Sequence, residues 1–408
     1  MNFHPAQRGL SYVNSPSMAL AMLTAVLLVG SGGDAVAVEH AQPTPKASLD
    51  VGGRLQLVGY GERLEDGIRD DNRMYLFLRQ ARLMATGRMS DVTLRLEMAF
   101  GGEEEVKAPS PGVSLGLLEA SADVGLLASL RLRAGQFRVP YGRERLANPA
   151  TMLFVDRSIT NLAFNTGRDV GVALYGTKAG MTATVGVFTG GGRSIPQRFL
   201  PQTLGTPMLV ARAGWSSSGV AEDPFDMRQQ ATSVDSFVFA VHANALWQKD
   251  SLVGHSSVFN LKLSDRPLLL NANWNPYVGA KPTGSATVDQ GTLMQIGGDI
   301  LIRAPLAGGT LSAEVEVNQG TFTNVLGSVS AIGGRAQVAL RIGDIEVAAR
   351  YATLLSGADF KIAAVDLLAG KSIHEVTPAV SWHLNPHTKL LAELPVTMNT
   401  PTVRDNGI

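Results

Sequence analysis

Basic side chains gather in one stretch of the chain, between Arg138 and Arg168. This stretch holds five arginines and only two acidic residues, Glu144 and Asp156. Guanidinium groups in a narrow, low-dielectric space attract anions, and rings of Arg or Lys are a known device of anion-conducting pores. The residues that could bind an anion here are Arg138, Arg143, Arg145, Arg157 and Arg168.

A structural role for some of these arginines is the competing explanation. Arg157 and Arg168 each stand beside an aspartate, Asp156 and Asp169, and such pairs could hold the segment in place. We therefore consider Arg143 and Arg145 the better candidates for contact with a solute.

Other kinds of functional site find little support. The chain has no Cys, so it can form neither a disulfide nor a thiolate metal site. It also has no Walker loop and no paired-His zinc motif, and we expect no catalytic residues, no metal and no cofactor. Ser236 and His242 are six residues apart, which on an extended strand separates them by about 20 Å. The 35 basic and 35 acidic side chains balance, which argues against a nucleic-acid partner.

The basic stretch is expected to connect two strands. From Leu130 to Phe137, residues such as Leu132 alternate with residues such as Arg133. A side-chain period of two is typical of a strand with one apolar face and one charged face. A second strand should begin at Arg168. A long connection between two strands is usually functional.

Segments with the same alternation follow one another from Arg54 onward. Val315 and Val317, for example, alternate with Glu314 and Glu316. Strict alternation over segments of roughly ten residues is typical of a transmembrane barrel. A soluble β-sandwich also alternates, but charges on the polar face of most segments favour a wet lumen. We predict an all-β fold, a transmembrane antiparallel β-barrel.

The connections between these segments support the barrel, because short ones alternate with long ones as in outer-membrane barrels. Short connections include Gly343–Asp344, and the long ones include 138–167. The segment from Ser216 to Asp235 is an exception, since it is long where a short turn is expected.

Charges on the predicted inward faces are balanced. Adjacent strands carry opposite signs, so cross-strand pairs should neutralise much of the wall. The seven basic residues are Arg95, Arg131, Arg133, Arg335, Arg341, Arg350 and Lys389, and the seven acidic ones are Glu97, Glu119, Asp123, Glu314, Glu316, Glu346 and Glu393. The six arginines are the predicted pore lining.

The N-terminus has the features of a signal peptide. The apolar run at residues 18–30 is too short for a comfortable membrane span, follows Arg8 and precedes the small-x-small site Ala35–Ala37. A buried helix is the alternative. We therefore predict a signal peptide at residues 1–37, a linker at 38–50, the barrel at 51–395, and a polar tail or weak closing strand at 396–408.

Five short motifs occur between residues 75 and 176 in a fairly specific order and spacing. They are Phe77–Leu83, Gly135–Phe137, Pro140–Gly142 with Glu144, Asp156–Ser158, and Arg168–Val172. In these motifs the chain resembles the phosphate-selective porins O and P of bacterial outer membranes. The resemblance implies a barrel of about 16 strands, a loop that folds inward and narrows it, and a homotrimer in outer-membrane lipid.

The function that this resemblance implies is passive diffusion of small polar or anionic solutes, possibly phosphate-like. The wall charges balance, but the stretch from Arg138 to Arg168 has three more basic than acidic residues, so we expect a mild anion preference if this stretch enters the lumen. Two alternatives stay open: a lipase-like barrel enzyme of the outer membrane, and a non-conducting structural surface barrel.

Closure of the barrel depends on the number of strands. That number is odd by our count, whether or not a doubtful pair near residues 252–274 is included. The tail could form a weak closing strand, the edge could stay open, or the number could be even because of one miscounted strand. We expect an even number of strands. The strand at Leu390 should then pair directly with the strand at Leu55, and no strand should form at 396–403.

Overall fold

The computed structural model divides the chain into two units, Met1–Thr44 and Pro45–Ile408. It describes residues 47–65, 70–102, 116–164, 167–190, 207–219, 222–230, 234–252, 290–324, 327–360, 372–385 and 387–400. All of these belong to the second unit. The predicted signal peptide, most of the linker and the doubtful strand pair near residues 252–274 lie outside the described residues.

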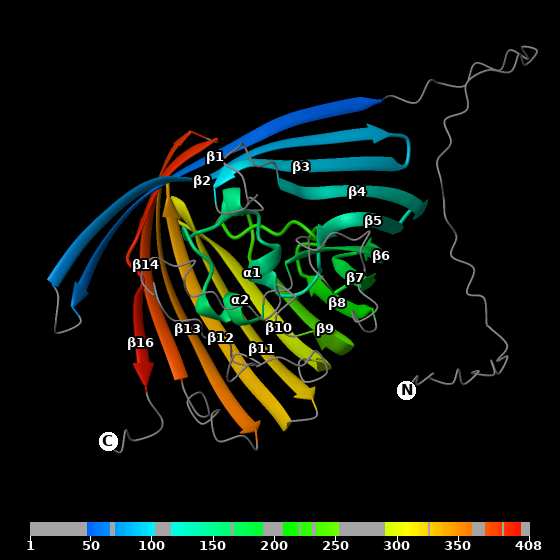
Figure 1. Cartoon of the computed structure of the whole chain (residues 1–408). Coiled ribbons are helices and arrows are strands. Elements are labelled where there is room, and N and C mark those ends of the chain that lie inside the picture. The colour runs from blue at the N-terminus through cyan, green and yellow to red at the C-terminus, as the bar shows by residue number, and fades with distance from the viewer. Residues whose placement is uncertain are drawn as a thin grey trace, which may run out of the picture. The chain divides into compact units, whose positions relative to one another are not determined.

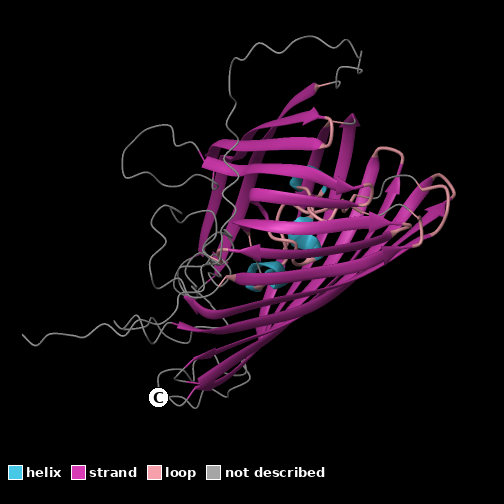
Figure 2. Cartoon of the chain, turned by 90° about the vertical axis from the view of Figure 1, so that its right-hand side faces the viewer, coloured by secondary structure: helices cyan, strands magenta, loops and turns pink. Residues whose placement is uncertain are grey.

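The second unit is built on one antiparallel sheet of 16 strands, of which the first 15 follow one another in chain order. The sheet curves around short helices on its concave side (Figure 1 and Figure 2). This confirms the prediction of an all-β antiparallel fold with about 16 strands. The strands are β1 (Ser48–Glu65), β2 (Asp70–Met89), β3 (Val92–Gly102), β4 (Gly116–Leu127), β5 (Leu130–Arg138), β6 (Arg168–Lys178), β7 (Met181–Phe188), β8 (Met208–Ser216), β9 (Val238–Leu252), β10 (Gln290–Leu306), β11 (Gly309–Asn324), β12 (Gly327–Ile342), β13 (Ile345–Phe360), β14 (Ser372–Asn385), β15 (Thr388–Glu393) and β16 (Val396–Thr400).

The strands turn their apolar side chains outward and their polar side chains inward. On β11, Glu314 and Glu316 are buried, whereas Val315 and Val317 are 44% and 50% exposed. The same reversal occurs on β13, where Arg350 is buried and Tyr351 is exposed. A water-soluble protein shows the opposite distribution, while a sheet with an outward apolar band suits a lipid surrounding.

Two-residue turns join many of the strands at one end of the sheet. The turn between β6 and β7 needs positive φ at both Ala179 (49°) and Gly180 (79°). The turn of β10 and β11 uses Gly308 and that of β12 and β13 uses Gly343, again with positive φ. Such backbone conformations favour glycine and keep the connections tight.

The long connection between β5 and β6 lies on the concave side of the sheet (Figure 2). It contains α1 (Arg143–Leu146), the 3-10 helix η1 (Pro149–Thr151) and α2 (Ile159–Ala163). Aromatic side chains from this connection and from the surrounding strands form the largest buried apolar cluster. None of the described helices is long and apolar enough to cross a bilayer. The predicted boundaries at Leu130 and Arg168 are both confirmed.

The C-terminal strands differ from our expectation. Leu390 on β15 pairs with Trp382 of β14, and Leu55 pairs with Ala81 of β2; the predicted direct pairing of Leu390 with Leu55 is not among the pairings of the described strands. Val396–Thr400 forms β16, which we did not expect, and it pairs with β14. In the described part of the chain, no backbone pairing joins β1 to β15 or β16.

The break between β15 and β16 contains Pro395. β15 and β16 both run along the same edge of β14, and the interruption between them falls at Leu394 and Pro395. Proline has no amide hydrogen to donate to a neighbouring strand, so the backbone pairing with β14 is interrupted at Pro395. The chain nevertheless continues in the same direction into β16. β16 then stops directly before a second proline, Pro401.

The outward apolar face generates a first prediction. Val317→Arg places a charge on a lipid-facing surface and should cost about 2–4 kcal/mol of folding stability if the position lies near the bilayer midplane. The measurement is the urea midpoint of refolding into lipid vesicles. Val317→Leu is the control, since it keeps the position apolar. An Arg variant as stable as the Leu variant would show that this face does not contact lipid.

Candidate functional site

The segment from Val139 to Gly167 enters the interior of the sheet at a tight turn. Gly142 has φ 71°, and its N–H donates to Asn244 Oδ1 on β9 at 3.3 Å. A Cβ at this position would come within 2.9 Å of Glu316 Oε1 on β11. The backbone of this turn therefore lies directly against the wall, and only glycine combines this conformation with this approach.

Glu144 on α1 is the main attachment of the segment to the distant wall. Its carboxylate accepts hydrogen bonds from the N–H and Oγ of Ser158, at 2.9 and 2.5 Å. It also lies 3.5 Å from Arg335 on β12 and 3.3 Å from Arg350 on β13. Burial by itself would raise the pKa of Glu144, but these two arginines and Ser158 bring that pKa below its usual value. Glu144 is therefore ionised at neutral pH and joins the two halves of the segment to the wall.

Further contacts carry the segment across to the strands at both ends of the sheet. Asp156 pairs with Arg79 on β2. The N–H of Val155 donates to Glu393 on β15 at 2.8 Å, and the Lys389 ammonium donates to the carbonyl of Met152 at 2.5 Å. The segment thus crosses the interior of the sheet, as the family resemblance implied.

Arg143 is enclosed by carboxylates and is fully buried. Its guanidinium lies 2.6 Å from Glu222, 3.4 Å from Asp299 on β10 and 3.4 Å from Glu314 on β11. The structure therefore places Arg143 in a compensated ion-pair cluster, not on an open surface. Arg145, the other residue that we preferred, is partly buried on the same helix.

Arg157 and Arg168 have partners that the sequence did not indicate. Arg157 donates to the carbonyls of Glu144 and Ala147, at 3.1 and 3.2 Å, and Arg168 lies 2.5 Å from Glu97 on β3. Burial and the neighbouring Arg138 lower the pKa of Arg157 to about 9, which leaves it cationic at neutral pH. Both arginines thus hold the segment in position, though through other partners than adjacent aspartates.

The connection between β8 and β9 also enters the interior, and this explains the unusual length of Ser216–Asp235. Met227 forms a parallel β-bridge with Ala147. Its N–H donates to the carbonyl of Leu146 at 3.0 Å, and its carbonyl accepts from the N–H of Asn148 at 2.8 Å. The phenyl ring of Phe225 lies under the guanidinium of Arg133, 4.0 Å from ring centroid to Cζ. Residues 222–230, which we call the second inner segment, therefore dock on the first.

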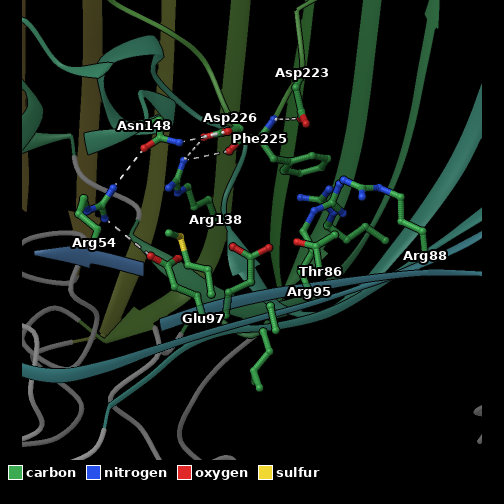
Figure 3. Close-up of a pocket in the computed structure, with 15 residues that line it drawn as sticks. Arg54, Thr86, Arg88, Arg95, Glu97, Arg138, Asn148, Asp223, Phe225 and Asp226 are labelled. Carbon is green, nitrogen blue, oxygen red and sulfur yellow. Dashed lines mark hydrogen bonds and ion pairs between the residues drawn. The ribbon is translucent and has the colours of Figure 1, made fainter. Parts of the chain in front are cut away.

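A cavity of about 300 Å³ lies between these two segments and strands β1 to β5 (Figure 3). Arg138 stands at its edge and donates to Asp226 at 3.0 Å and to the carbonyls of Leu146 and Phe225. Five arginines and four carboxylates line the cavity. They are Arg54, Arg88, Arg95, Arg133 and Arg138, with Glu97, Glu119, Asp223 and Asp226.

Cross-strand pairing of the wall charges is confirmed for four of the six predicted lining arginines. Arg133 on β5 lies 2.7 Å from Asp123 on β4, and Arg335 lies 3.1 and 2.9 Å from Glu314 and Glu316 on β11. Of the other predicted lining residues, Arg95 pairs with Asp123 and Arg350 lies 3.0 Å from Glu375 on β14. Arg131 and Arg341 bond to carbonyls of Asp91 and Gly343 in short turns.

The structure brings Arg95, Arg133 and Arg138 together at the cavity and leaves the other predicted arginines elsewhere. Sequence reasoning missed Arg54, Arg88, Asp223 and Asp226. The anomalous length of the β8–β9 connection was the one available signal for the two aspartates. No comparable signal marked Arg54 or Arg88.

The attachment of the segment at Glu144 generates a second prediction. Glu144→Gln removes one partner each from Arg335 and Arg350, which keep other carboxylates, so we expect a loss of about 1–3 kcal/mol of stability. The segment should also loosen, which should increase single-channel conductance. Urea unfolding and planar-bilayer recording measure the two effects.

Arg341→Gln provides the control for Glu144→Gln. The Arg341 guanidinium donates to the carbonyl of Gly343 in the short turn between β12 and β13. This variant should keep the conductance of wild type. Unchanged conductance in Glu144→Gln would show that Glu144 does not hold the segment.

Comparisons with known proteins agree with this geometry. Residues 51–216 match the family model of phosphate-selective porin O and P, which confirms the resemblance. No curated protein matches the chain.

Solved structures of outer-membrane proteins share the fold. An anion-selective porin from Comamonas acidovorans is similar with TM-score 0.54 and 13% identity, over 87% of this chain and 90% of that one. A loop L8 deletion mutant of OmpT, an outer-membrane protein of Vibrio cholerae, gives TM-score 0.53 and 9% identity, over 87% and 95%. Residues 51–216 thus match the phosphate-selective porin O and P family, and the chain has the fold of these outer-membrane proteins.

Proposed function

We propose that this porin is a passive diffusion channel for small polar and anionic solutes, with a mild preference for anions. The observation that carries the proposal is the lining of the cavity beside the inner segments, where arginines outnumber carboxylates by five to four. Charged side chains that line a narrow passage set its ion preference. An excess this small supports a weak preference rather than a strong one.

Arg95 is the arginine most suited to contact a passing anion. Arg95 and Arg133 share one carboxylate, Asp123, so one of their two positive charges is uncompensated within this group. The side chain of Arg95 is 30% exposed, whereas that of Arg133 is 3% exposed. The more accessible guanidinium therefore faces the cavity.

This assignment replaces our preference for Arg143 and Arg145. Three carboxylates surround Arg143, so an anion would have to displace them at a high desolvation cost. Neither residue lines the cavity. We propose that solutes contact Arg54, Arg88, Arg95 and Arg138 instead.

The channel is a better explanation than an enzyme. His242, which a lipase-like site would need, is buried and lies 3.1 Å from Asp299 of the ion-pair cluster. Ser236 is exposed outside the strands. The lack of backbone pairing between β1 and β15 or β16 in the described residues fits a non-conducting structural barrel, whereas the charged cavity favours conduction. The similar porin from Comamonas acidovorans is itself anion-selective, which supports the same preference here.

The anion preference generates a third prediction. Arg95→Ala should lower the anion-to-cation permeability ratio, by about twofold at 0.1 M salt, because screening is weak over the width of a narrow passage. The reversal potential across a planar bilayer under a salt gradient measures this ratio. Arg341→Ala is the control, because Arg341 bonds to a turn carbonyl and does not line the cavity.

Two outcomes would contradict the proposal. A wild-type protein that inserts into bilayers without conducting would refute the channel. A wild-type anion-to-cation permeability ratio below one would refute the anion preference.

We also propose a mature homotrimer that begins at Val38, on the basis of the family resemblance and the small-x-small site before that residue. The prediction is an outer-membrane form whose detergent-corrected mass corresponds to three chains without residues 1–37. Light scattering and intact-chain mass spectrometry measure the two quantities. A monomer at all concentrations would contradict the trimer, and a chain that keeps residues 18–30 would contradict the cleavage.

A further inference from the structure

We propose that the second inner segment, residues 222–230, determines the ion preference of this porin through Asp223 and Asp226. The inference rests on the proposed channel and adds residues that neither the family motifs nor the wall strands supply. These two aspartates would reduce an anion preference that the arginines alone would make strong.

The position of the two aspartates is the first argument. Both line the same cavity as Arg54, Arg88 and Arg95, and the close-up shows them on the side opposite β1 to β3 (Figure 3). Both residues are exposed, and the Asp226 side chain is 46% exposed. Carboxylates on one side of the cavity therefore face arginines on the other.

The segment holds these carboxylates in fixed positions, which is the second argument. Phe225, between the two aspartates, packs edge-to-face against Phe137 and Tyr175, with ring centroids 5.4 and 5.1 Å apart. Met227, two residues after Phe225, forms the β-bridge to the first segment. The charges of residues 223 and 226 are thus anchored to the buried core and do not swing freely on a loop.

The ion pairing of the two aspartates is the third argument. Asp226 lies 3.0 Å from Arg138 and neutralises it. Asp223 accepts a hydrogen bond from the N–H of Phe225 at 2.9 Å and attracts Arg95, although no described arginine or lysine lies within ion-pair distance of it. One aspartate thus removes a positive charge from the cavity, and the other adds a negative charge.

Without these two charges, the carboxylates among the residues that line the cavity would be Glu97 and Glu119, against five arginines. The excess of positive charge over the lining would rise from one to three. Because the lining surrounds a space smaller than the Debye length of about 10 Å at 0.1 M salt, a passing ion would sense most of this change.

The experiment compares reversal potentials of wild type, Asp223→Asn and Asp223→Asn/Asp226→Asn in planar bilayers with KCl gradients. Asparagine keeps the side-chain oxygen that caps the Phe225 N–H, so Asp223→Asn should leave the segment docked. We expect the anion-to-cation ratio to rise about twofold in the single variant and further in the double variant at 0.1 M salt, and to rise little at 1 M, where screening is strong.

Asp235→Asn is the matched control. Asp235 belongs to the same connection and is exposed, but it does not line the cavity. The anion-to-cation permeability ratio of Asp235→Asn should therefore equal that of wild type. If wild type and Arg95→Ala behave as proposed but Asp223→Asn does not change the ratio, the role of the second inner segment is refuted while the anion channel stands. If wild type does not conduct, the channel itself is refuted.

Discussion

Compensation of charge inside the barrel is the constraint on which the rest of this structure depends. The inward faces carry arginines and carboxylates that the two inner segments cover. An ionised group without water or a partner costs several kcal/mol. Glu144 lies between Arg335 and Arg350, and Arg143 lies among Glu222, Asp299 and Glu314. The inner segments therefore fold where they supply the missing charges of the wall.

The same constraint explains why the two segments meet. The β5–β6 connection leaves the end of the sheet opposite the short turns, while the β8–β9 connection leaves the end that carries those turns. Arg143 of the first segment needs Glu222 of the second, and Arg138 needs Asp226. Phe225 adds apolar contact with Phe137, and the backbone of Met227 adds a β-bridge. Each inner segment thus provides ion-pair, apolar and backbone contacts to the other.

The accessible cavity is what these contacts leave unfilled. Charges that are buried among opposite charges, such as Arg143 and Arg335, contribute little to the field outside the clusters. Charges at the edge, such as Arg95 and Asp223, are accessible. Burial, and not residue type, therefore separates the charges that are enclosed in ion-pair clusters from those that are accessible at the cavity.

The sequence by itself determined the fold class, because alternation of valines with glutamates along β11 reports directly which face meets lipid. It also located the inner segment, since its motifs and its strand boundaries at Leu130 and Arg168 are local features. Pairing between neighbouring strands followed as well, because residues such as Asp123 and Arg133 are related by a short turn and a fixed register.

Only the tertiary structure decided which arginines face the cavity. Arg143 and Arg95 are both basic residues in suitable segments, but the first is enclosed by carboxylates that come from three distant parts of the chain. The docking of residues 222–230 depends on contacts across nearly 80 positions, as between Arg143 and Glu222. The edge on which β16 pairs is likewise set by the position of β13, which already pairs along the other edge of β14. No local sequence pattern encodes such long-range contacts. They depend on how segments that are distant in the sequence pack against one another in three dimensions.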